Sequence, residues 1–272
     1  MGESRILGIG QTVITYVIFS TLLMVGFMDA MALSAVIGFS IFISLPLVMR
    51  GNQGRRRMSF LNAVAIGILI FLIGDVFLDA AGSLYDGSLY GYGSSPVNDF
   101  VFAASMAAGF VVLFTMGNRR KGGLAPSQLA MVIAVGIAFQ NLTEGMLFGA
   151  LSAGIGFTGA ALVVLVGFVL QNSTEGLPIA SPFLGAMDGN GRVLAGALFV
   201  GGTPTVLGGA LGYIYNATMF DLALYGLAVG TMLYVILPML RNLLSESDSG
   251  RLGLAYAGVF VGFVLGFAAN LL

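Results

Sequence analysis

The chain contains no histidine and no cysteine. Without histidine it lacks the commonest transition-metal ligand and the usual general base of enzymes. Without cysteine it can form neither disulfide bonds nor thiolate metal sites. Charge is also scarce, since only 8% of the residues are charged and eleven basic residues stand against twelve acidic ones. This balance provides no basic surface of the kind that binds nucleic acid, so no nucleic-acid partner is expected.

Apolar residues, in contrast, make up 58% of the 272 residues. Soluble domains carry about 25% charged residues, and a chain with so few charges cannot hide this much apolar surface in a soluble core. The excess must face the lipid bilayer. The sequence therefore predicts an all-α, multi-pass integral membrane protein of the cell membrane. No polar segment is long enough for a separate domain, so residues 1–272 form a single transmembrane domain.

Nine apolar runs are long enough to cross the hydrocarbon layer, which requires about 20 residues each. They are Ile6–Gly26, Met31–Met49, Met58–Ala81, Asn98–Met116, Pro126–Leu151, Phe157–Ser181, Val193–Tyr215, Thr218–Leu240 and Leu252–Leu272. The first run lacks a small-residue cleavage site, which favours a retained helix over a removed signal peptide.

The basic residues predict how these helices are oriented. With the N-terminus inside, all eleven fall in cytoplasmic segments: Arg5, Arg50, Arg55, Arg56, Arg57, Arg119, Arg120, Lys121, Arg192, Arg241 and Arg251. The external segments carry Asp29, Asp86 and Asp99 instead. Cytoplasmic loops are rich in Lys and Arg, so the pattern predicts nine transmembrane helices with the N-terminus inside and the C-terminus outside.

Four acidic residues lie at membrane depth in the predicted spans: Asp75, Asp79, Glu144 and Glu175. No Lys or Arg lies in any span to neutralise them, and charges at membrane depth are costly. Their counter-charge must come from protons, an ion or water in a cavity. Asp75 and Asp79 lie toward the outer end of their span, where an acidic pair could gather cations; a solvated helix end explains Asp79 equally well.

The motif Gln-Asn-x-Thr-Glu-Gly occurs twice, at Gln140–Gly145 and at Gln171–Gly176. On a helix, its Gln, Asn and Glu share one face, because they are three and four residues apart. The two spans are joined by a short Gly-rich turn and should be antiparallel neighbours, with both motifs at a similar depth. Two carboxylates and up to four amide oxygens would then suit a divalent cation. The alternative is that the motifs only supply hydrogen bonds between helices.

At these residues the sequence resembles the ZIP family of divalent metal transporters. The resemblance implies that Gln140, Asn141, Glu144, Gln171, Asn172 and Glu175 are metal ligands. It also implies a homodimer, with the metal ion as transported substrate and no prosthetic group. The expected function is transport of Zn, Fe or Mn class ions, and not enzyme catalysis.

Several positions depart from the family pattern. Gln140 stands where the family usually has His, and Thr143 and Thr174 stand where it usually has Pro. Thr205, and the pair Pro238 and Met239, replace residues that often form a second, adjoining metal site, which argues against such a site here. An all-oxygen site favours harder ions such as Mn²⁺ or Fe²⁺ over Zn²⁺.

Two other functions fit the sequence less closely. A relative that binds metal without transporting it, as a sensor or scaffold, fits the missing ligands. A membrane-embedded enzyme using the four acids is the other alternative, although the sequence contains no His, no Cys and no Gly-x-Gly-Asp protease motif.

Overall fold

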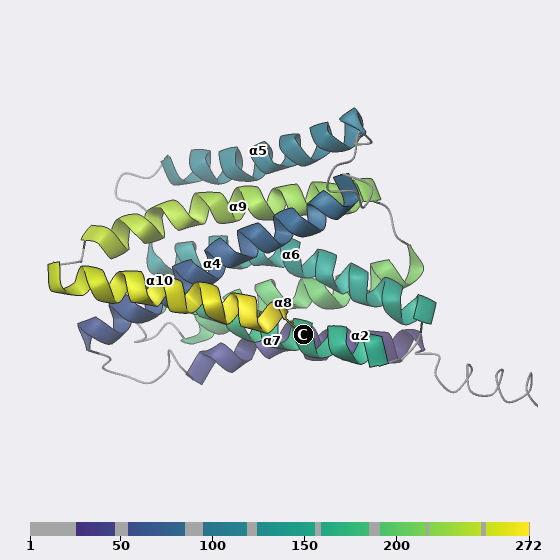
Figure 1. Ribbon diagram of the computed structural model, residues 1–272, viewed down its shortest axis with the longest axis horizontal. Coiled ribbons are helices and arrows are strands. Elements are labelled where there is room, and N and C mark those ends of the chain that lie inside the picture. Colours follow the sequence, from purple (N-terminus) through teal and green to yellow (C-terminus); the bar gives the residue numbers. More distant parts are fainter. Residues whose placement is uncertain are drawn as a thin grey trace, which may run out of the picture.

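The computed structural model describes residues 26–46, 54–84, 95–118, 124–155, 159–184, 191–215, 218–245 and 249–271. The elements, of which Figure 1 labels the α-helices, are α2 (Phe27–Phe39), the 3₁₀ helix η1 (Ser40–Ser44), α4 (Arg55–Leu84), α5 (Pro96–Asn118), α6 (Pro126–Ile155), α7 (Gly159–Ala180), the 3₁₀ helix η2 (Ser181–Phe183), α8 (Gly191–Ile214), α9 (Thr218–Ser245) and α10 (Ser249–Asn270). Within these described ranges, eight stretches are long and apolar enough to cross a membrane.

These eight stretches confirm the all-α membrane architecture and coincide with the second to ninth predicted spans. The first predicted span, Ile6–Gly26, falls outside the described residues except for Gly26. The ninth helix and the orientation in the membrane stay predictions.

The start of α2 differs from the prediction. Residues 26–30 were expected to interrupt the helices before Met31, but α2 already begins at Phe27. The backbone N–H of Gly26 donates to the Asp29 carboxylate at 3.2 Å, and the Ala30 N–H donates to the Gly26 carbonyl at 3.0 Å. An acidic side chain in the first turn of a helix satisfies a free backbone N–H group. Asp29 therefore stabilises the start of α2, although the sequence had placed it in the loop before the helix.

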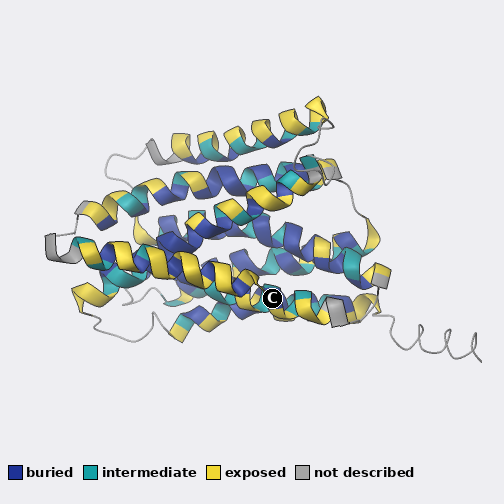
Figure 2. Ribbon diagram, viewed as in Figure 1, coloured by how far each residue is buried: buried dark blue, intermediate teal, exposed yellow. Residues whose placement is uncertain are grey.

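Large apolar side chains cover the outside of the bundle. Leu78 of α4, Phe100 of α5, Ile214 of α8 and Phe260 of α10 are each at least 69% exposed. Figure 2 shows α5 and α10 with long exposed stretches, while α6 and the middle of α9 are mostly buried. Such apolar surface would be costly in water and is favourable in lipid, so the exposure pattern agrees with a membrane protein.

Helices α6 and α8 are in contact along their backbones. Added Cβ atoms at Gly145, Gly149, Gly208 and Gly212 would overlap the carbonyl oxygens of Thr205, Gly209, Leu142 and Met146, respectively. Only glycine permits so close an approach, as is common where helices associate in lipid. This seam fixes the helix that carries the first motif against α8.

Candidate functional site

The two repeated motifs meet inside the bundle. All six predicted side chains, Gln140, Asn141, Glu144, Gln171, Asn172 and Glu175, are buried, with exposed fractions of 5% or less. The first three lie on α6 and the other three on α7. The structure thus brings the predicted residues together away from the lipid.

The motifs are paired reciprocally. Gln171 Nε2 of α7 donates to Glu144 Oε1 of α6 at 2.6 Å, and Gln140 Nε2 of α6 donates to Glu175 Oε1 of α7 at 3.3 Å. Each Gln therefore binds the Glu of the other motif. Gln140 Nε2 also donates to Glu144 Oε1 at 3.0 Å, which confirms that the i and i+4 side chains share one face.

Glu144 is the acceptor on which the amides converge. Besides the two glutamines, Asn172 Nδ2 donates to Glu144 Oε2 at 3.3 Å. Asn141 Nδ2 donates to the Gly201 carbonyl of α8 at 2.9 Å. The sequence had suggested amide oxygens turned toward an ion, whereas the amide N–H groups are turned toward the carboxylate. Residues 124–184, which include both motifs, contain no basic side chain. The amide N–H groups, and not a positive charge, are therefore the groups that can stabilise a charged Glu144 carboxylate.

Four oxygen atoms of the site have no hydrogen-bond partner among the residues that the structure describes. They are Gln140 Oε1, Asn141 Oδ1, Asn172 Oδ1 and Glu175 Oε2, and all four are buried. Buried polar atoms are almost always satisfied, and each exception needs an explanation such as an ion. Three are neutral carbonyl-type oxygens and one belongs to a carboxylate, a donor chemistry that suits a hard cation.

Carboxylates alone are too few to hold a metal ion in the described residues. No group of three or more His, Cys, Asp or Glu side chains is placed there to do so. Any ion at the motifs must therefore take amide oxygens as ligands in addition to Glu144 and Glu175. The hydroxyls of the motif threonines Thr143 and Thr174 donate to the carbonyls three residues earlier on their own helices, at 2.6 and 2.7 Å.

A cavity of about 230 Å³ leads to the site from the Asp75 and Asp79 side. Its lining includes both of these acids, together with Glu144, Gln171 and Asn270. Gln171 Nε2 donates to Asp75 Oδ2 at 3.3 Å, and Asn270 Nδ2 donates to the other oxygen of Asp75. A polar path thus connects the end of α10 with the buried motifs.

Asn270 is the residue of this path that the sequence did not predict. It lies in the last turn of α10, 195 residues from Asp75. The only available indication was a single polar residue near the end of an apolar run, at the same predicted membrane face as Asp75. That pattern also describes an ordinary helix end.

The positions of the doubtful second metal site make no hydrogen bond to this network that the described residues show. Thr205 is fully buried on α8, and its hydroxyl has no hydrogen-bond partner. Met239 belongs to the apolar core, and Pro238 lies within α9. Neither residue of α9 brings an oxygen ligand, so the expectation of a single site remains.

The sequence matches no family model and no curated protein. The resemblance to ZIP transporters therefore rests on the motif residues and stays a prediction.

Proposed function

We propose that the protein transports divalent metal ions of the Zn, Fe or Mn class across the membrane, with the two motifs as its transport site. The observation that supports this most is the set of four buried, unpartnered oxygen atoms beside two buried glutamates. A cation would supply the partner that these atoms lack.

The charges of the site favour a divalent ion over a monovalent one. Glu144 and Glu175 together balance one M²⁺, and the helices that carry them contain no Lys or Arg to compete. Amide and carboxylate oxygens are ligands for hard ions, whereas zinc is bound best by imidazole and thiolate. Mn²⁺ and Fe²⁺ are therefore the preferred substrates in this proposal.

Uptake into liposomes tests the proposal directly. The purified protein is reconstituted, and the influx of Mn²⁺, Fe²⁺ and Zn²⁺ is measured separately. We expect Glu144→Gln and Glu175→Gln to abolish influx, while the matched change Asp99→Asn on α5, outside the site, preserves it. Undiminished influx in the Glu144→Gln/Glu175→Gln double variant would disprove the proposal.

The same preparation separates the alternative functions. Equilibrium binding of Mn²⁺ without any influx would identify a metal-binding sensor or scaffold. Turnover of lipid or peptide by the purified protein, lost in Asp75→Asn, would identify an enzyme.

A further inference from the structure

The bundle contains a second cavity at the opposite ends of the helices that form the site. It has a volume of about 180 Å³, and Asn62 of α4, Pro126 and Leu129 of α6, Ser181 of η2, and Met239 and Asn242 of α9 contribute to its lining. The motifs and this cavity share α6, so the two can be ordered along one helix.

Along α6 the features follow in a fixed sequence. Pro126 and Leu129 line the second cavity, the buried Ile133 and Ile137 follow, and then comes the motif that starts at Gln140. Residues 130–139 contain no polar side chain. At a rise of about 1.5 Å per residue, the apolar stretch from residue 130 to residue 137 is about 10 Å long.

Helix α4 shows the same order. Asn62 lines the second cavity, Ile66 and Leu69 are buried in the apolar core, and Asp75 and Asp79 line the first cavity. Residues 63–74 contain no polar side chain. Both α4 and α6 pass the second cavity first, then the apolar stretch, and then the residues that line the first cavity. The apolar stretches of the two helices therefore lie at the same height in the bundle.

Helix α7 runs the opposite way and shows the reverse order. Gln171 lines the first cavity, Glu175 lies in the motif, Ile179 is fully buried in the apolar core, and Ser181 beyond it lines the second cavity. The second cavity is thus separated from the motifs by the same apolar level on a third helix.

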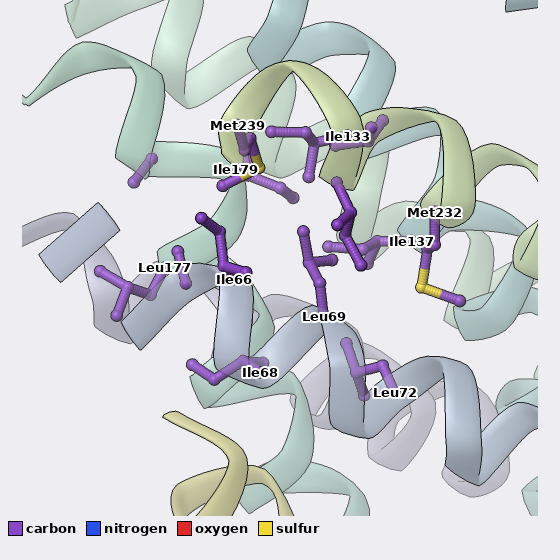
Figure 3. Packing of buried hydrophobic residues seen from close by; sticks show 14 of the residues in the cluster. Ile66, Ile68, Leu69, Leu72, Ile133, Ile137, Leu177, Ile179, Met232 and Met239 are labelled. Atoms are coloured by element: carbon purple, nitrogen blue, oxygen red, sulfur yellow. The ribbon is translucent and has the colours of Figure 1, made fainter. Parts of the chain in front are cut away.

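The side chains of this level form one contiguous cluster. In Figure 3, Ile66 and Leu69 of α4, Ile133 and Ile137 of α6, Ile179 of α7 and Met239 of α9 point toward one another. We call Ile66, Leu69, Ile133, Ile137 and Ile179 the apolar plug. Each is at most 1% exposed, and Met239 joins the plug to the second cavity.

A metal ion cannot cross this plug as it stands. The plug side chains carry no polar atom over about 10 Å, so passing between them would strip the ion of its water and oxygen ligands at a cost far above thermal energy. An ion at the motifs can therefore exchange only through the cavity lined by Asp75 and Asp79.

We infer that the apolar plug is the closed gate of the transport path, and that the structure is the state in which the motif site communicates with the Asp75 and Asp79 cavity alone. The second cavity is the vestibule that the ion reaches when Leu69, Ile137 and Ile179 move apart. The role of the plug as a gate rests on the proposed transport function. Whether the plug is closed can be tested without any ion.

Single-cysteine variants test the plug, and the chain needs no prior substitution because it has no cysteine. Val164→Cys reports the first cavity, Asn62→Cys the second, and Leu69→Cys and Ile137→Cys the plug. The protein is placed in nanodiscs, which expose both faces, and is treated with a charged methanethiosulfonate. We expect both cavity positions to react and both plug positions to react on the order of 100-fold more slowly, as for an open state populated at about 1%.

Plug positions that react within a few-fold of the cavity positions would overturn the inference. If either plug variant fails to fold, Ile66→Cys and Ile133→Cys test the same level of α4 and α6. If the plug cysteines are protected and no metal influx occurs, the transport function is refuted, but the plug is still a barrier between the motifs and the second cavity. If metal influx occurs and the plug cysteines react readily, the plug is not the gate, but the transport function is retained.

Discussion

At the scale of single residues, Glu144 and Glu175 have different surroundings although their motifs match. Glu144 accepts hydrogen bonds from Gln140, Gln171 and Asn172, whereas Oε2 of Glu175 has no partner. The two carboxylates should therefore contribute differently to stability, with Glu144 organising the amides and Glu175 offering its free oxygen to the ion.

Substitution by glutamine should reveal this difference in thermal unfolding. Without metal, Glu144→Gln should lower the free energy of unfolding by about 1–3 kcal/mol, because its new N–H group faces N–H donors. Glu175→Gln should leave it nearly unchanged, because Oε2 of Glu175 accepts no hydrogen bond that the substitution removes and the remaining oxygen can still accept from Gln140. Equal destabilisation by both variants would contradict this assignment.

Metal binding gives a second readout for Glu175. A concentration of Mn²⁺ about 100-fold above its dissociation constant should raise the unfolding free energy of the parent protein by about 2.7 kcal/mol. Glu175→Gln should lose most of that gain, and Asp99→Asn should keep it. The comparison is made by thermal unfolding in detergent with Mn²⁺ and with Mg²⁺; an undiminished gain in Glu175→Gln would remove this residue from the ligand set.

Asp75 lines the first cavity, where its charge should attract cations. Asp75→Asn should raise the Mn²⁺ concentration at half-maximal influx several-fold at low ionic strength, with a smaller effect in 1 M salt, where the screening length is about 3 Å. Asp99→Asn should show no such salt-dependent difference. An effect of Asp75→Asn that is equal at both ionic strengths would instead indicate a local role through its hydrogen bonds to Gln171 and Asn270.

At the scale of helices, the glycine seam between α6 and α8 holds the first motif in place. Replacing glycine by alanine at two positions of α8 should change the free energy of unfolding in opposite directions. Gly208→Ala would press a Cβ into the Leu142 carbonyl and should destabilise by about 1–3 kcal/mol. Gly196→Ala meets nothing within 4 Å and should stabilise by about 0.5–1 kcal/mol through helix propensity.

Chemical unfolding in mixed micelles measures both variants. If Gly208→Ala were neutral, α8 could move away from α6 without cost, and the close seam would not determine the position of the motif. Influx measured on the same Gly208→Ala sample would then show whether the site depends on this contact.

At the scale of the whole molecule, length and hydropathy were sufficient to predict the spans within the described residues, because crossing lipid requires a long, uninterrupted apolar run. The meeting of the two motifs was also predictable, since a short turn makes consecutive helices antiparallel neighbours. Asn270 was not, because its contact with Asp75 joins α10 to α4 and leaves no local pattern in the sequence.

The orientation of the amides could not be predicted either. The sequence specifies that Gln171 and Asn172 carry both a donor and an acceptor, but which atom faces Glu144 depends on what lies opposite in three dimensions. The apolar plug was hidden for a related reason. Residues 63–74 and 130–139 look like ordinary span interiors, and only the cavities at either end give them a separate role.

The charges of the bundle predict how it is oriented in the membrane. Arg55, Arg56 and Arg57 begin α4, and Arg241 lies near the end of α9, at the same left-hand end of Figure 1 where α10 begins. Positive residues favour the cytoplasm, so the second cavity should face inward and the Asp75 cavity outward. Gly54 and Ser95 are exposed and directly precede α4 and α5, whose first turns lie at opposite ends of the bundle in Figure 1, so Gly54→Cys and Ser95→Cys test this with an impermeant maleimide. Ser95→Cys should react in intact cells and Gly54→Cys only after permeabilisation; the reverse pattern would make the present state one that is open to the cytoplasm.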